Sequence, residues 1–155
     1  MNFISLDDLP KKIPIFPLTG AVLFPKTQLP LNIFEPRYVQ MLNAALATPH
    51  KLIGMIQPIA GSDNSLKKVG CVGRVTSYNE TDDHRYLITL NGIIRFEIEN
   101  ELDTTTQYRQ VEVNYENFIT DLKSEDVTNV DRESLLKLIK KYLKNKSLLA
   151  DWDII

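Results

Sequence analysis

The 155-residue sequence contains one cysteine and two histidines. The lone Cys71 cannot form a disulfide within the chain, and this cysteine usage is typical of a reducing compartment. His50 and His84 are isolated and, taken with Cys71, lack the spacings of a metal-binding motif. We therefore expect neither a metal ion nor a cofactor, and we interpret Cys71, which lies in a strand pattern, as a small buried core residue.

The sequence also lacks a long hydrophobic run. No segment approaches the roughly 18 apolar residues of a membrane span, and the N-terminus, MNFISLDDLPKK, does not have the order of a secretory signal. The formal net charge is −2, whereas general binding to phosphate backbones usually requires a basic face. We therefore expect a cytoplasmic protein with no membrane partner, for which nucleic acid is a disfavoured partner.

Signatures of common enzymes are missing as well. The sequence has no GxxxxGK[ST] phosphate loop and no GxSxG nucleophile elbow. The run Asp82, Asp83, His84 and Arg85 offers an acid–base pair, but aspartates that bond to the backbone are typical of a hairpin turn. We favour the turn and predict a non-enzymatic protein with no catalytic residues.

Short apolar segments predict a protein built mainly of β-strands. The first, residues 11–18, contains two prolines, and we expect it at a sheet edge because proline has no amide donor. A second strand is expected at residues 28–34. The Asn91-Gly92 pair is a strong hairpin signal, and it separates two of the later strands. Five strands are expected after the first helix, at residues 52–59, 69–79, 85–90, 93–101 and 108–116.

One early segment has the periodicity of a helix. Apolar residues recur there at the spacing of a single helix face, at Tyr38, Met41, Leu42, Ala45 and Leu46. The helix is expected at residues 36–48. Pro36 suits its first position, and the charge of Glu35 suits the positive end of the helix dipole. Phe34 is expected to anchor the corner before the helix.

A second helix is expected near the C-terminus. Residues 118–130 are polar and irregular, which predicts a linker. Beyond it, from about Asp131, an apolar stripe predicts an amphipathic helix, formed by Leu135, Leu138, Ile139, Tyr142 and Leu143. The order of elements indicates a closed or half-closed antiparallel sheet with helices at its margins.

The stretch LPLNIFEPRYVQML, residues 29–42, has two interpretations. It is either a corner where a strand becomes a helix or a site of ligand contact. Pro30, Glu35 and Pro36 all suit the corner. Arg37 is the residue that the corner explains least, and we expect it to pair with Glu35 or another acid.

Three short motifs follow one another in the first part of the chain, at Pro14–Leu18, Val22–Pro25 and Pro30–Tyr38. They correspond to PLFPL, VLFP and PLHIFEPRY, and through them residues 12–116 resemble the Lon protease N-terminal (substrate-binding) domain family. Asn32 stands where the family commonly has histidine, and His84 stands where it often has glycine. Later matches follow in order, at Val69-Gly70, Val72–Val75, Asp83–Leu87, Gly92 and Arg95-Phe96.

The resemblance implies a mainly β (α+β) fold, a PUA-like β pseudo-barrel with one early helix followed by a C-terminal helical segment. It divides the chain into a β domain at residues 1–118 and a linker with a C-terminal amphipathic helix at residues 119–155. In full Lon proteases this domain helps to select substrates and to assemble the particle, ahead of ATPase and Ser-Lys protease modules. Neither module fits in this chain, so we expect a stand-alone Lon-domain protein or an excised domain.

We therefore predict a module of protein quality control that binds exposed apolar or unfolded polypeptide segments in a shallow groove. The expected contacts are Phe34, Glu35, Pro36, Arg37 and Tyr38 at the corner, together with Ile13 and Ile15 at an open edge that accepts an added strand.

Three alternatives remain open. The first is a PUA-like RNA-binding module that uses the lysines near residues 137–146. The second is a regulator that docks on a protein partner, or on a second copy of the chain, through the C-terminal helix. The third is a hydrolase, which requires a nucleophile beside a placed base, and no such pair is evident.

Overall fold

The computed structural model describes residues 5–123 and 132–145. The chain forms two compact units, Met1–Lys123 and Ser124–Ile155. The first unit contains every described strand, and the second contains helix α2 (Arg132–Asn145). Within the described ranges, no helix has the length and the apolar character needed to cross a lipid bilayer.

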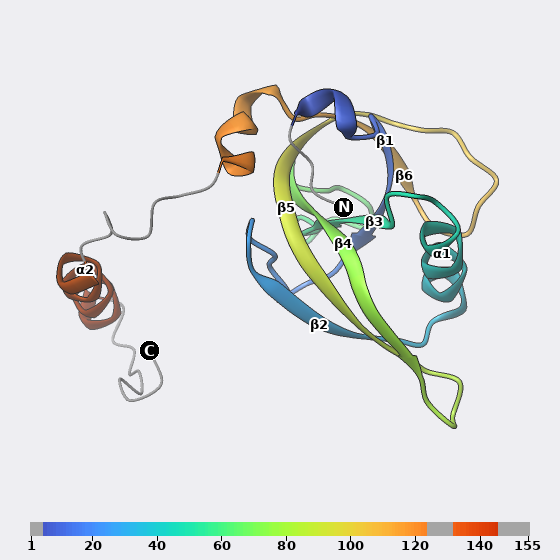
Figure 1. Cartoon of the computed structure of the whole chain (residues 1–155), viewed down its shortest axis with the longest axis horizontal. Helices are drawn as coiled ribbons and strands as arrows, with labels where there is room; N and C mark the ends of the chain where they lie inside the picture. Colours follow the sequence, from blue (N-terminus) through green and yellow to red (C-terminus); the bar gives the residue numbers. More distant parts are fainter. Residues whose placement is uncertain (1–4, 124–131, 146–155) are drawn as a thin grey trace. The chain divides into compact units, whose positions relative to one another are not determined.

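Six strands in the first unit form one mixed sheet that closes on itself. Its order is β2-β5-β4-β3-β1-β6, and β5 also pairs with β6, so that five strands complete a barrel and β2 extends from its side. Figure 1 shows β4 and β5 as long strands that join in a projecting hairpin. The mainly β fold is therefore confirmed. The strands are β1 (Lys12–Pro17), β2 (Gln28–Ile33), β3 (Leu52–Ile56), β4 (Val69–Glu80), β5 (Tyr86–Glu101) and β6 (Gln110–Asn114).

Strand β1 lies inside the sheet, so the prediction of an edge strand there is wrong. It pairs in parallel with β3 and antiparallel with β6. The parallel pair also corrects the prediction of an antiparallel sheet, because the sheet is mixed. The side chains of Ile13 and Ile15 are buried in the core. Strand β1 has no open side, and the strand addition expected at Ile13 and Ile15 has no site there.

The two prolines of β1 are tolerated because of where the ladders begin and end. The Leu18 amide donates to Ile56 O of β3 at 3.1 Å. Alternation along the strand therefore turns the nitrogen of Pro14 towards β3, whose pairing with β1 begins only at Ile15. The nitrogen of Pro17 faces the β6 side, where pairing has already stopped at Pro14. Neither proline removes a ladder hydrogen bond.

Asn91-Gly92 is not a turn. Strand β5 runs through both residues without interruption, and β4 joins β5 instead through residues 81–85. The turn predicted at Asp82–Arg85 is therefore correct, and His84 adopts a φ of 62° within it. That left-handed conformation favours glycine, which is the residue that the resembled family often has there.

The open edge of the sheet lies at β2, which pairs only with β5 among the described strands. The Gly92 amide donates to Thr27 O at 2.8 Å. Alternation from that point directs the amides of Leu29 and Leu31 towards β5 and leaves Pro30 on the open side. Pro30 thus removes a donor from the edge, a common protection against unwanted strand pairing.

Helix α1 (Pro36–Leu46) forms where its periodicity predicts and ends two residues earlier than expected. It buries Tyr38, Met41, Leu42 and Ala45 against a core cluster that includes side chains of β1, β3 and β5. Phe34 does not anchor the corner, because its side chain is 56% exposed. A second cluster fills the other face of these strands and contains Ile13, Ile15, Val72, Ile94, Phe96 and Val111.

Two short 3₁₀-helices complete the first unit, η1 (Leu6–Asp8) and η2 (Glu116–Leu122). The start of the predicted linker, from residue 118, therefore belongs to η2, because Phe118 and Leu122 pack on the barrel core. The expected domain boundary at residues 118/119 falls inside this helix. Helix α2 forms within the predicted region, whereas Asp131, where the helix was expected to begin, and the side chain of Leu143 lie outside the described residues.

Candidate functional site

The first unit has a mainly apolar groove of about 190 Å³ between the loop that follows β1 and the adjoining ends of β3 and β4. The loop contributes Val22, Leu23 and Phe24, and the strands contribute Met55, Ile56, Val69 and Cys71. Three polar side chains, Gln57, Lys67 and Arg95, also line it. The groove thus combines an apolar surface with polar side chains, a combination common in sites that bind apolar ligands.

The loop presents its apolar residues on alternate sides. Leu23 is only 4% exposed, whereas Val22 and Phe24 are 51% and 61% exposed. Leu23 lies against Gly73 and Gly92, where added Cβ atoms would approach its side chain to 2.7 and 3.3 Å. The two glycines therefore form a seat for Leu23, and seating Leu23 leaves its two neighbours facing solvent.

Hydrogen bonds hold the loop on the sheet. The Thr27 hydroxyl donates to Phe24 O at 2.8 Å, and the Phe24 amide donates to Thr27 Oγ1 at 3.3 Å. The Lys26 amide donates to Gly92 O at 2.8 Å. Because these contacts restrain the backbone at Phe24, less conformational entropy is lost there when a ligand binds.

The part of the groove formed by Cys71 is uncharged. Burial raises the pKa of the Cys71 thiol to about 12, with a smaller contribution from the carboxylate of Asp121. The thiol therefore stays protonated at neutral pH and behaves as a small apolar group. Among the described residues, no cluster of three or more histidines, cysteines or acids could hold a metal ion.

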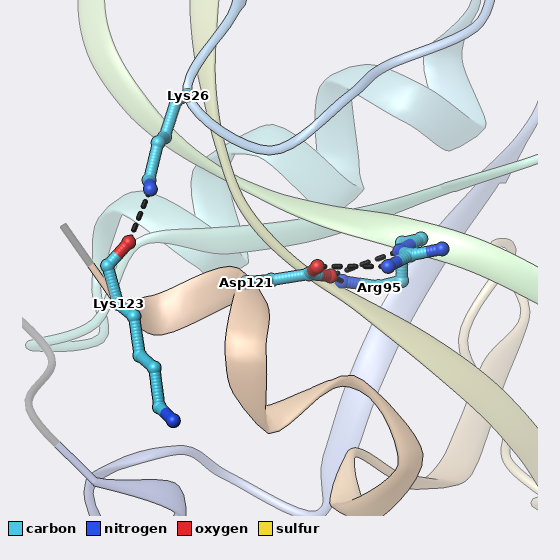
Figure 2. A network of polar contacts seen from close by, with 4 residues as sticks. All are labelled: Lys26, Arg95, Asp121 and Lys123. Atoms are coloured by element: carbon cyan, nitrogen blue, oxygen red, sulfur yellow. Dashed lines mark hydrogen bonds and ion pairs between the residues drawn. The ribbon is translucent and has the colours of Figure 1, made fainter. Parts of the chain in front are cut away.

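At the rim, Arg95 is held by η2. Its backbone amide and Nε both donate to Asp121 Oδ2 at 3.0 Å, and Nη2 donates to Oδ1 at 2.9 Å (Figure 2). The guanidinium carbon also lies 4.7 Å from the centroid of the Phe118 ring. Close by, the Lys26 ammonium donates to the Lys123 carbonyl (Figure 2). These contacts attach η2 both to β5 and to the loop that forms the groove.

The Arg95 hydrogen bonds also set the charge state of Asp121. They lower the pKa of the carboxyl below its ordinary value, and the nearby Lys26 ammonium adds a smaller effect in the same direction. Burial acts in the opposite sense but is outweighed. Asp121 is therefore ionised at neutral pH and offsets the charge of Arg95.

The predicted corner is a separate surface. The structure brings Glu35, Arg37 and Tyr38 together, with Arg37 Nε 3.0 Å from Glu35 Oε2 and its guanidinium carbon 4.6 Å from the Tyr38 ring centroid. The expected pairing of Arg37 with Glu35 is therefore correct. Tyr38 stacks on Phe16 at 4.2 Å and belongs to the core.

The remaining predicted residues have other surroundings. Pro36 begins α1, as expected. Phe34 lies 5.2 Å from the guanidinium carbon of Arg85, which is in the β4–β5 turn. A polar pocket of about 190 Å³ adjoins the corner and is lined in part by Arg37, Tyr38 and Arg109. Both arginines already pair with carboxylates, Arg37 with Glu35 and Arg109 with Glu101, so the pocket does not offer an uncompensated positive charge.

The sequence interpretation did not select Val22, Phe24, Lys67 or Arg95 as site residues. The available signal was the alternation Val22-Leu23-Phe24 within a segment bounded by turns. That pattern alone does not say which side chains face solvent. The answer depends on where Leu23 is buried. The seat is formed by Gly73 and Gly92, which are 50 and 69 residues further along the chain.

The sequence model of the "ATP-dependent protease La (LON) substrate-binding domain" family matches residues 12–155. A relative named Lon protease, from Parabacteroides distasonis, is 32% identical over 135 residues, which covers 83% of this chain and 15% of the relative. Lon protease 2 from Sorangium cellulosum is 31% identical over 93 residues, covering 57% of this chain and 12% of the relative. The chain thus spans a small part of the length of these relatives.

Two solved structures share the fold. The crystal structure of a Lon N-terminal domain protein from Xanthomonas campestris aligns with a TM-score of 0.58 and 23% identity, covering 67% of this chain and 59% of that chain. The N-terminal domain of Lon protease from the Mycobacterium avium complex aligns with a TM-score of 0.60 and 13% identity, covering 88% and 70% respectively.

Proposed function

The chain belongs to the ATP-dependent protease La (LON) substrate-binding domain family, and we propose that it binds exposed apolar segments of unfolded polypeptides in the groove beside Val22 and Phe24. The observation that carries this proposal is the pair of exposed apolar side chains held on a fixed loop over an apolar groove. A polypeptide that covers them removes apolar surface from water. This burial is favourable by about 25 cal/mol per Å² and offsets the entropy cost of association.

The size of the groove favours a chain segment over an enclosed small molecule. Sites for drug-sized ligands usually measure about 300–1,000 Å³, whereas this groove measures about 190 Å³. That volume accepts one or two apolar side chains of an extended segment while the rest of the segment stays in solvent. Binding of this kind is weak and tolerant of sequence, which suits recognition of many different unfolded chains.

The corner at Phe34, Glu35, Pro36, Arg37 and Tyr38 stays a prediction as a second binding surface. Its exposed apolar residues are Phe34 and Pro36, because Tyr38 is engaged in the core. We propose that residues 1–155 catalyse no reaction. A cytoplasmic location, homodimer formation and docking through α2 also stay predictions.

Matched serine variants test the proposal. Full-length chain is titrated against a permanently unfolded, reduced and alkylated polypeptide, and affinity is measured by fluorescence anisotropy. F24S should weaken binding by roughly five- to tenfold, because about 1 to 1.5 kcal/mol of apolar burial is lost. L87S is the control, since Leu87 is exposed on β5 and does not line the groove.

F34S is measured alongside these variants. If F34S weakens binding while F24S does not, the corner rather than the groove is the binding surface. If the wild-type chain shows no affinity for the unfolded polypeptide, the proposed function itself is wrong.

A further inference from the structure

The charged side chains that line the groove are positive, whereas the net charge of the chain is negative. The chain carries a formal net charge of −2, but the charged side chains that line the groove are the cations Lys67 and Arg95. No carboxylate is among the described residues that line it. Lys26, which follows Phe24 and Pro25 in the loop, adds another cation close enough to lower the pKa of Asp121.

One carboxylate, that of Asp121, already binds to this cationic rim. Its side chain is 9% exposed, whereas the side chain of Arg95 remains 46% exposed. The ion pair therefore offsets one cation but leaves part of the Arg95 guanidinium open to solvent. Arg95 thus already donates hydrogen bonds to a carboxylate of its own chain, the interaction that an acidic ligand would make.

Lys67 and the adjacent Lys68 differ in whether their ammonium groups form an ion pair. Lys68 Nζ lies 3.7 Å from Glu97 Oε2. Both lysines line a neighbouring depression of the surface, but only Lys67 also lines the groove. Lys67 is exposed and takes part in none of the ion pairs that the structure gives for the described residues, although its backbone amide donates to Gln57 O at 2.9 Å. Of the two cations that line the groove, Lys67 is therefore the one that lacks such a counter-charge.

We propose that the groove prefers apolar segments that carry an Asp or Glu beside the inserted apolar residue, with Lys67 and the exposed part of Arg95 attracting the carboxylate. This inference rests on the proposed function and names the class of segment that the same groove accepts. An extended segment advances about 3.3 Å per residue. A carboxylate one or two positions from the inserted side chain therefore reaches the rim.

Three peptides with one apolar core test the preference, flanked by Glu, by Gln or by Lys. Their affinities for the full-length chain are measured at low ionic strength and again in 0.5 M salt, with amide shifts of Val22 and Phe24 reporting groove occupancy. The Glu-flanked peptide should bind about two- to fivefold more tightly than the Gln-flanked one, and the Lys-flanked peptide should bind more weakly by a similar factor. High salt should reduce both differences.

Charge reversal at two neighbouring lysines supplies the matched control. K67E should abolish or reverse the preference, whereas K68E should leave it unchanged, although both substitutions alter the net charge equally. Lys67 is chosen because Arg95 also holds η2, so that an Arg95 variant would disturb the fold. Both lysines are exposed, and their substitution leaves the core untouched.

The possible results separate the two proposals. Equal affinities for the three peptides, with Val22 and Phe24 still shifting, overturn the charge preference and leave the proposed function standing. A preference that survives in K67E or disappears in K68E also overturns it. If no peptide shifts Val22 or Phe24, the proposed function fails and the charge preference fails with it.

Discussion

The backbone carbonyl of Phe24 lies directly against Gly92, so closely that a Cβ atom on residue 92 would be 2.0 Å from Phe24 O. Contacts that short do not occur between real Cβ atoms and carbonyl oxygens, because the two atoms overlap. The loop at residues 21–27 can approach β5 only because residue 92 has no side chain. The shape of the groove therefore depends on this glycine.

Substitution of Gly92 by alanine should displace the loop. We expect G92A to lower the free energy of unfolding by at least about 1–3 kcal/mol and to abolish binding of unfolded polypeptide at the groove. Urea denaturation and anisotropy measure the two effects. G61A is the comparison, since Gly61 has a φ of 81° with open space around it. It should show the cost of backbone strain, about 1–2 kcal/mol, with binding retained.

Neighbouring residues of the loop should separate stability from binding. L23A removes a buried side chain and should lower the free energy of unfolding by about 2–5 kcal/mol. F24A removes an exposed one and should change it by no more than about 0.5 kcal/mol, while still weakening polypeptide binding. Equal destabilisation by the two variants, measured by urea denaturation, would contradict the alternating arrangement.

The ion pair between Arg95 and Asp121 predicts a pH-dependent contribution to stability. Because Arg95 lowers the pKa of Asp121 in the folded state, the contribution is present above the ordinary carboxyl pKa and is lost as the pH falls through the lower folded value. D121N should lower the free energy of unfolding by about 1–2 kcal/mol at pH 7.

The control for D121N is its own pH profile. The difference between wild type and variant should shrink as the pH falls below about 4. The measurement is urea denaturation of both proteins from pH 7 to pH 2.5. A constant difference over that range would show that the ion pair does not hold η2 through the charge of Asp121.

The open edge at β2 predicts a role for Pro30. P30V restores an amide donor on the open side and raises strand propensity. The variant should fold normally but self-associate at lower concentrations than wild type, as light scattering would show. Q28T is the comparison, because residue 28 already has an amide on that side. If P30V stays as monodisperse as Q28T, Pro30 does not protect the edge.

The fold class could be predicted because it depends on local periodicity. The helical spacing from Tyr38 to Leu46 and the alternation in β6 both predict elements that the structure contains. Strand pairing was predicted less well, because it depends on residues far apart in the sequence. The β1 ladder with β6, for example, joins Ile13 to Val111, and no local pattern indicates that pairing.

Asn91-Gly92 shows how a local signal can have another cause. The dipeptide suits a tight turn, yet Gly92 is required here by the close approach of Phe24 rather than by a turn. The groove was not predicted from the sequence because it forms where a loop meets glycines of two strands that lie far along the chain. The corner around Arg37 and Glu35 lies within a few residues, and the pairing there was predicted correctly.

The most direct test of the proposed groove is an NMR titration of ¹⁵N-labelled full-length chain with a permanently unfolded, apolar polypeptide. The proposal predicts amide shifts concentrated at residues 21–24 and 69–71, with little change around Leu87. Shifts confined to residues 34–38, or no shifts at any ratio of polypeptide to protein, would contradict the assignment of the groove as the binding site.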